Sequence, residues 1–369
     1  MPVTKVIKQP SDLIFNTVVA QATAGNEVAA VTLLQPGDAE SVVLVHSADE
    51  MPDMGFDENT DVYDVVAAMY EVKDFEGPVA IGTYSSSPVV SLDDLTVIPT
   101  ADGATIGAQV SGVQKYLEDH LLDGSTWFVP VGMSDDDIKT AADILYTNQR
   151  GFLVNQVDNI ADLQKWHDYA TTTQVEKNKL GHFRTLVDKD NTRKIAGQAA
   201  AYASTKVLLD WMRIGDLSQF VANDWTQSEL NMIDNLHGLA VVNKSGNMML
   251  SGNKELNGDQ IDNSFNAQYN TDLIQTRLQK WLNGKDYTTF NDDNINELVT
   301  TAETAGEDLF KEGTIAADIN GKADFSVTAV SRSQVSAYEI TQRTYKSLSI
   351  KQTLPNAIEK VYVSNSISL

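Results

Sequence analysis

Several residue types and patterns are missing from this chain of 369 residues, and each absence narrows the possibilities. There is no cysteine, which excludes a disulfide scaffold, a thiolate metal site and a cysteine nucleophile, and favours a reducing compartment. No apolar run approaches the ~20 residues needed to span a bilayer, and the opening MPVTKVIKQP lacks the layout of a signal peptide. With 42 % apolar residues and only nine prolines, the composition instead predicts a globular protein.

Basic residues are scarce as well, with 27 lysines and arginines against 51 acidic residues and a formal charge of -24. A chain this acidic repels phosphate, so we expect no nucleic-acid partner. The acidity is concentrated in residues 1–150, which hold 24 acidic and six basic residues. The ends reverse the sign: residues 1–11 hold two lysines and no acid, and residues 325–369 hold five basic and two acidic residues. The pattern describes an acidic body with basic ends.

Short β-branched runs alternate with amphipathic helical stretches from about residue 28 to residue 212. The predicted buried strands are Val42–Val45, Val79–Ile81, Trp127–Val131 and Leu153–Val157. Helical stripes are predicted from Val62 to Tyr70, from Ile106 to Leu121, after the capping residue Ser134, from Ile160 to His167, and over the alanine-rich stretch Lys194–Met212. Strands that recur with helices between them indicate βαβ units and a mainly parallel sheet.

The segment after residue 215 follows a different plan. Thr226 with Glu229 predicts a capping box, and the turn NKSGN between two apolar runs predicts a hairpin over residues 239–250. Two long helices are expected next, one from Phe265 to Trp281 and one from Ile295 to Leu309, with Gly313 ending the second. Beyond Gly313 the pattern is strand-like.

Both ends of the chain have the pattern of extended strands. In IEKVYVSNSISL the apolar side chains alternate with polar ones, as expected when one face of a strand is covered. PVTKVI near the amino end is similarly β-prone. We therefore expect two extended strand arms. Their apolar contacts would come from Val3, Val6, Ile7, Ile358, Val361, Val363, Ile367 and Leu369, and their charges from Lys5, Lys8, Lys351 and Lys360.

No pattern for catalysis, metal binding or cofactor binding stands out. The acid-rich stretch after residue 45 has one glycine, so it cannot form the glycine-rich phosphate turn of a dinucleotide site. The five histidines are scattered without HExxH spacing, and no GxSxG elbow occurs. Asp135–Asp137 fits a solvated first helical turn, and Asp318–Asp324 lacks the glycine position of a calcium loop. We predict no catalytic, metal or cofactor residue.

Four stretches, in order, resemble the contractile-tail sheath proteins of bacteriophages. They are VAAMYEVKDFEGPVAIGTYS, the alanine-rich KIAGQAAAYASTKV, the run from GDQID through two helices to KEGTIA, and QRTYKSLSIKQTLPNAIEKVYVSNSIS. Gln260 stands where an aromatic residue is common in the family. The resemblance covers perhaps 80 % of the chain, and at this length the chain would be a minimal-size form of the family.

The resemblance implies a structural protein and not an enzyme. Many copies would form a helical homo-polymer around a tail tube, linked by exchanged terminal strands, and contract to drive the tube into a host cell. The implied partners are the tube protein, the baseplate and tail terminator proteins, with no cofactor, nucleic acid or membrane contact. The implied location is the virion tail, after synthesis in the host bacterial cytoplasm.

The expected fold class is α/β: a βαβ-type body with a mixed sheet, a smaller C-terminal α+β domain, and extended N- and C-terminal strand arms. The expected domains are an N-terminal arm over 1–20, an outer body over 21–260, an inner sheath domain over 261–350 and a C-terminal arm over 351–369. The alternatives are the sheath of a tailocin or another contractile injection system, a different virion protein such as a tube or adhesion subunit, and a cytosolic α/β enzyme.

Overall fold

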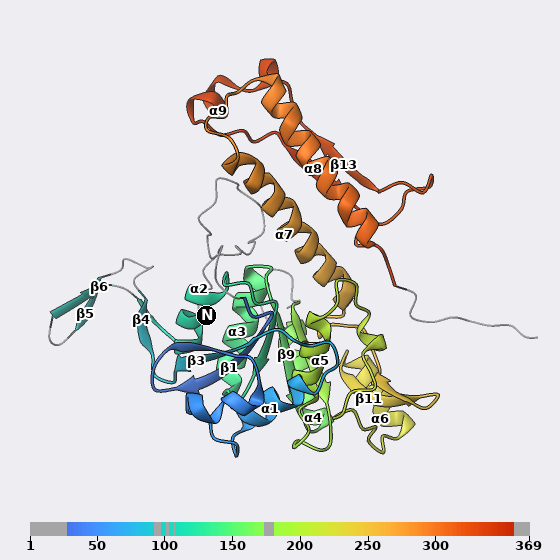
Figure 1. Ribbon diagram of the computed structural model, residues 1–369. Coiled ribbons are helices and arrows are strands. Elements are labelled where there is room, and N and C mark those ends of the chain that lie inside the picture. The colour runs from blue at the N-terminus through green and yellow to red at the C-terminus, as the bar shows by residue number, and fades with distance from the viewer. Residues whose placement is uncertain (1–27, 92–96, 101–102, 107, 173–180, 358–369) are drawn as a thin grey trace, which may run out of the picture. The chain divides into compact units, whose positions relative to one another are not determined.

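A computed structural model describes residues 28–91, 97–100, 103–106, 108–172 and 181–357. The chain divides into two compact units, Met1–Ile261 and Asp262–Leu369, which we call the body and the C-terminal unit. Figure 1 shows the helices and strands of each unit. No helix among the described residues combines the length and apolarity that crossing a bilayer requires.

The body is built on one eight-stranded sheet of order β12-β11-β10-β9-β8-β1-β3-β2. The six inner strands run parallel, whereas β2 and β12 are antiparallel edges, so the expected mixed sheet is confirmed. The bounds are β1 Val31–Gly37, β2 Ser41–Val45, β3 Val79–Ser85, β8 Trp127–Pro130, β9 Phe152–Val157, β10 Phe183–Val187, β11 Leu239–Lys244 and β12 Asn247–Leu250. Sequence reasoning located β2, β3, β8 and β9 but did not single out β1 or β10.

Helices cover both faces of this sheet. Their bounds are α1 Asp61–Tyr70, α2 Gly112–His120, α3 Asp135–Thr147, α4 Ile160–Thr172, α5 Ile195–Ser204 and α6 Gln227–Asn235. Leu153 packs in one apolar cluster with residues of α2, α3 and α4. Gln156, three residues along β9, accepts a hydrogen bond from the backbone of Ala196 in α5. Because side chains alternate along a strand, α5 lies on the face opposite α3 and α4.

Local capping chemistry sets several of the predicted boundaries. Ser134 accepts a hydrogen bond from the Asp137 backbone at the start of α3, and Thr226 forms a full capping box with Glu229 at α6. The β11–β12 turn places Ser245 at φ 57° and Gly246 at φ 101°, the left-handed pair typical of a tight hairpin turn. These three predictions are confirmed.

Two helix predictions were too long. Residues 103–106 and 108–110 are strands β6 (Gly103–Ile106) and β7 (Ala108–Val110), paired with β5 (Val97–Thr100) and β4 (Val89–Ser91), and α2 begins only at Gly112. Strand partners close in the chain outweigh the helical spacing of Ile106 and Val110. Similarly, α5 ends at Ser204 because the hydroxyls of Ser204 and Thr205 bond to nearby carbonyls, and Asp210 caps a separate 3-10 turn, Trp211–Arg213.

The C-terminal unit contains two long helices and a two-stranded sheet. The helices are α7 Ile261–Asn283 and α8 Asp292–Glu312, as expected from their apolar spacing. Gly313 adopts φ 87° directly after α8, which confirms it as the residue that ends this helix. The strands are β13 Phe325–Thr328 and β14 Ser349–Gln352. The connection between them is not strand-like throughout, because it contains a 3-10 turn at Arg332–Gln334 and the short helix α9, Ala337–Thr341.

Candidate functional site

The β13–β14 sheet has two strands, and each has an outer edge without a strand partner among the described residues. The pairing runs from Phe325 opposite Gln352 to Thr328 opposite Ser349. Just beyond the pair, the Thr353 amide donates to the Asp324 carbonyl at 3.0 Å. A two-stranded sheet is rarely stable by itself, so this one depends on packing against the helices beneath it. The main-chain N–H and C=O groups along its outer edges are available to pair with a further strand.

The direction of these main-chain groups follows from the register. In an antiparallel pair, hydrogen-bonded residue pairs alternate with non-hydrogen-bonded ones. Since Thr353 bonds to Asp324, the inward-bonding pairs include Ser326 with Lys351. The amides of Phe325 and Val327 therefore point out from the β13 edge. Those of Ile350 and Gln352 point out from the β14 edge in the same way.

The helices beneath position this sheet. Phe325 packs directly over Gly306 of α8, where a Cβ atom added to the glycine would lie 2.3 Å from the Phe325 ring. A side chain at position 306 would therefore push the strand away. From α7, the buried Asn270 amide donates to the Thr314 carbonyl at 3.2 Å and to the Gln352 side-chain oxygen at 3.0 Å. Along β13 the half-buried side chains alternate with exposed Ser326 and Thr328, so one face is covered and one is open.

Most residues predicted to form the linking arms lie outside the described residues. These are Val3, Lys5, Val6, Ile7, Lys8, Ile358, Lys360, Val361, Val363, Ile367 and Leu369. Lys351 is described: it lies exposed in β14, opposite Ser326. The structure thus brings one of the predicted arm charges onto the two-stranded sheet. Sequence reasoning missed the open edges of this sheet, because β13 and β14 are separated by 20 residues of other structure.

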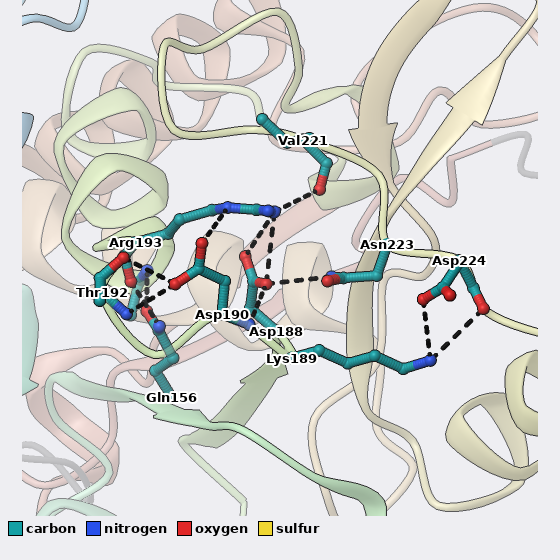
Figure 2. A network of polar contacts seen from close by, with 10 residues as sticks. Gln156, Asp188, Lys189, Asp190, Thr192, Arg193, Val221, Asn223 and Asp224 are labelled. Carbon is teal, nitrogen blue, oxygen red and sulfur yellow. Dashed lines mark hydrogen bonds and ion pairs between the residues drawn. The ribbon is translucent and has the colours of Figure 1, made fainter.

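A second polar cluster lies at the carboxyl end of β10, the edge where parallel α/β sheets commonly bind ligands. Figure 2 shows that its charged groups point at one another. The buried Asp188 carboxylate accepts from the Asp190 amide at 2.9 Å and from the Asn223 side chain at 3.0 Å, and Arg193 lies 3.4 Å from it. Arg193 also donates to the Val221 carbonyl at 3.0 Å. The cluster ties the β10–α5 loop to the segment before α6.

The neighbouring charges in this cluster are also engaged. Lys189 lies 3.2 Å from the Asp224 carboxylate and 3.6 Å from Glu229, with its ammonium 4.3 Å from the centre of the Trp225 ring. Hydrogen bonding to Lys189 lowers the pKa of Asp224 below its usual value. Hydrogen bonds from Thr192 likewise lower the pKa of Asp190. With its charges paired internally, the cluster braces loops and does not form a set of groups poised for proton transfer.

The acidic motifs considered as metal sites have local partners. At the start of α3, Asp137 accepts from Ser134 and Tyr84, and Asp136 pairs with Lys139 at 3.0 Å. Asp318 accepts from the backbone amides of Lys322 and Asn320, which lower its pKa. Within residues 28–357, apart from the gaps given above, no group of three or more histidine and acidic side chains is arranged to hold a metal ion.

An acidic surface covers one part of the body. Between residues 49 and 76, nine carboxylates are exposed. Asp61 pairs with Lys194 and Glu71 accepts a hydrogen bond from the Ser218 hydroxyl, whereas the other seven form no ion pair with a described residue. They are Asp49, Asp53, Asp57, Glu58, Asp64, Asp74 and Glu76. These residues lie in, or next to, the 3-10 turns Ala48–Glu50 and Pro52–Met54 and helix α1, and the first turn contacts both the second turn and α1.

The chain was compared with known proteins by sequence and by structure. No protein-family model matches the sequence, and no curated protein matches it. Solved structures do match over nearly the whole chain. The helical sheath of the anti-feeding prophage in its contracted state gives a TM-score of 0.60 at 10 % identity, over 97 % of this chain and 99 % of that chain.

Two further structures give the same result. The contracted sheath complex of the extracellular contractile injection system PVC gives a TM-score of 0.60 at 13 % identity, over 98 % of both chains. A chain of the anti-feeding prophage baseplate gives 0.59 at 10 % identity, over 97 % of this chain and 100 % of that chain. The resemblance expected from the sequence is thus confirmed for the fold: this chain has the fold found in the sheaths of contractile injection systems.

Proposed function

We propose that this protein is the structural subunit of a contractile sheath. The observation that carries the proposal is the two-stranded β13–β14 sheet, whose two edges have no strand partner among the described residues, in a chain whose fold matches those of two contracted sheaths over nearly its whole length. Copies of the chain polymerise helically around a tube, and strands from neighbouring copies extend this sheet. No catalytic step is part of the proposal, in keeping with the self-paired cluster at the carboxyl end of β10.

The link between subunits is strand addition by the two predicted arms. An extended arm of about 20 residues spans about 65 Å. A compact protein of 369 residues has a diameter of roughly 55 Å. An arm can therefore reach a neighbouring copy. Each added main-chain hydrogen bond contributes about 1 kcal/mol net, and alternate side chains fix the register. The apolar side chains of the C-terminal arm would continue the covered face formed by Phe325, Val327 and Ile350.

Such a contact is heterologous, because the arm of one copy meets a different surface on the next. When the rotation between successive copies does not close, the contact builds an open helix. Arms of this length also let the bodies repack while the chain-to-chain connections persist. Contraction then changes the contacts between bodies and leaves the added strands in place.

The machine that contains this sheath is also part of the proposal. A tail tube protein fills the sheath, with baseplate and tail terminator proteins at its ends, and the assembly is made in the bacterial cytoplasm. The sheath belongs to a bacteriophage tail, a tailocin or another contractile injection system. Genes for a capsid and portal beside this gene would identify a phage, and their absence from a complete gene cluster would identify a headless machine.

The test is assembly of the purified full-length protein at high concentration, viewed by negative-stain electron microscopy. We expect hollow tubes. Deletion of residues 358–369 should leave a soluble chain with the far-ultraviolet circular dichroism of the parent and no tubes. Normal tubes formed by the deletion variant would rule out linkage by the C-terminal arm, and a parent protein that never polymerises would count against the sheath function itself.

A further inference from the structure

The connection between β13 and β14 presents an unusual surface for so acidic a chain. Residues 329–348 contain three basic side chains and one acidic one. The basic residues are Arg332, Arg343 and Lys346, and none forms an ion pair with a described residue. Tyr338 of α9 is 69 % exposed among them. We call Arg332, Tyr338, Arg343 and Lys346 the α9 surface.

The segment that carries these residues is held in a fixed shape against the start of α8. The Arg332 amide donates to the Asp292 carboxylate at 2.6 Å, and the rings of Phe290 and Tyr345 lie 6.5 Å apart. The Tyr345 hydroxyl donates to the Val330 carbonyl at 2.8 Å. Figure 1 shows α9 beside the end at which α7 and α8 are joined. The basic side chains therefore extend from an ordered platform.

Carboxylates near this surface are already engaged by the backbone. Glu339 accepts from the Ser336 hydroxyl at 2.8 Å and from the Lys346 amide at 3.2 Å, which together lower its pKa. Asp292 accepts from the Arg332 amide as described. These carboxylates stabilise the fold of the segment. The guanidinium groups of Arg332 and Arg343 remain available for a partner.

Arg343 occupies a position whose backbone favours glycine. It directly follows the last cap residue of α9, at φ 54°. The Arg343 amide bonds to the Ile340 carbonyl at 3.1 Å, and the Thr344 amide bonds to the Glu339 carbonyl at 3.0 Å. This is the Schellman pattern, in which glycine usually fills the left-handed position. An arginine there costs conformational energy and supplies a charge that the fold of this unit does not use.

We propose that the α9 surface docks on the acidic surface of a second copy of this chain. Charge complementarity identifies the partner: the seven exposed carboxylates named above, which form no ion pair with a described residue, lie between residues 49 and 76 of every copy. Tyrosine and arginine are enriched at protein–protein contacts, and lysine and arginine steer association with an acidic partner. The contact rests on the proposed sheath function, but it uses surfaces distinct from the terminal arms.

The first test replaces Arg343 with glycine. Because glycine is favoured at this φ, Arg343→Gly should fold as well as the parent, with an equal or higher melting temperature. Its critical concentration for polymerisation should nevertheless rise about tenfold, as expected for loss of a desolvated charge contact. Lys280→Glu is the matched control, since Lys280 is an exposed base of the same unit that lies outside the α9 surface, and it should polymerise like the parent.

The second test exchanges the charges. Arg332→Glu with Arg343→Glu should block polymerisation at low salt, and adding Asp57→Lys with Glu58→Lys in the same chain should restore it. Parent tubes together with unimpaired Arg343→Gly tubes would overturn the docking contact and leave the sheath function standing. Failure of the charge exchange to restore assembly would also overturn the contact. A parent protein that stays monomeric at all concentrations would overturn both proposals.

Discussion

Arg184 and Glu255 form a fully buried ion pair, with the guanidinium Nη2 3.1 Å from the carboxylate Oε1. The same carboxylate accepts from the His182 amide at 2.7 Å. The Arg184 guanidinium also lies 4.6 Å from the ring centres of Phe152 and Trp211. Burial lowers the pKa of Arg184 to about 10, which leaves it charged at neutral pH. The pair fixes the segment before α7 to the centre of the body sheet.

Removing one member of this pair should be costly. Glu255→Ala leaves the arginine charge buried without its partner, so we expect a loss of about 3–5 kcal/mol in the free energy of unfolding. Urea unfolding of the full chain, followed by tryptophan fluorescence, measures the change. Asp224→Ala is the matched control because it removes an exposed partner of Lys189, and it should shift the unfolding midpoint little. Equal midpoints for the two variants would contradict the structural role of the pair.

His182 should make the stability of the body depend on pH. Burial lowers the pKa of its imidazole to about 4 from 6.5, and its Nδ1 donates to the Gly151 carbonyl at 2.7 Å. The unfolded chain binds a proton below pH 6.5 that the folded chain does not bind until about pH 4. The contribution of neutral His182 to the free energy of unfolding is therefore fully present above pH 6.5. It falls by about 1.4 kcal/mol per pH unit as the pH drops towards 4.

Asparagine tests this pH dependence because it tolerates the φ of 61° at position 182 and retains an amide donor. We expect His182→Asn to show a shallower loss of stability than the parent between pH 6.5 and 4. The readout is the difference between the urea midpoints of the two proteins at each pH. Parallel curves across this range would show that His182 does not contribute.

Gly306 should be required for the two-stranded β13–β14 sheet to pack against α8. Gly306→Leu places a side chain where the Phe325 ring packs, so we expect a less stable C-terminal unit and loss of tubes. Phe325→Ala in the same chain makes room and should recover part of the stability. Glu307→Leu, at the exposed neighbouring position of α8, is the control and should leave thermal unfolding unchanged. A Gly306→Leu chain that assembles normally would contradict this packing.

Proline at the open edge should separate folding from strand addition. The Val327 amide points out from β13, so Val327→Pro removes an outward donor and keeps the bonds to β14. We expect monomers that fold but do not form tubes. Val327→Ala should still assemble because it keeps the amide, whereas Ser326→Pro removes an inward donor and should unfold the strand pair. Tubes formed by Val327→Pro would show that this edge does not receive an arm.

Features that depend on neighbours in the chain could be predicted from the amino-acid sequence. Ser134, Thr226 and Gly313 set helix ends through hydrogen bonds and backbone preferences that act within a few residues, and the turn before Asn247 set the β11–β12 hairpin. The alternation of strands and helices was likewise sufficient to predict a mixed α/β sheet. The helix predicted from the spacing of Ile106 and Val110 was wrong at its start, because both residues belong to strands that pair with nearby strands.

Features that join distant segments could be found only in the folded chain. The Arg184–Glu255 pair connects residues 71 positions apart, and no local pattern distinguishes either side chain from a surface charge. The β13–β14 sheet and the α9 surface also follow from packing against α7 and α8. The physical reason is that periodicity and capping report energies within one helix or strand. Burial and long-range pairing depend on which elements the whole chain brings together.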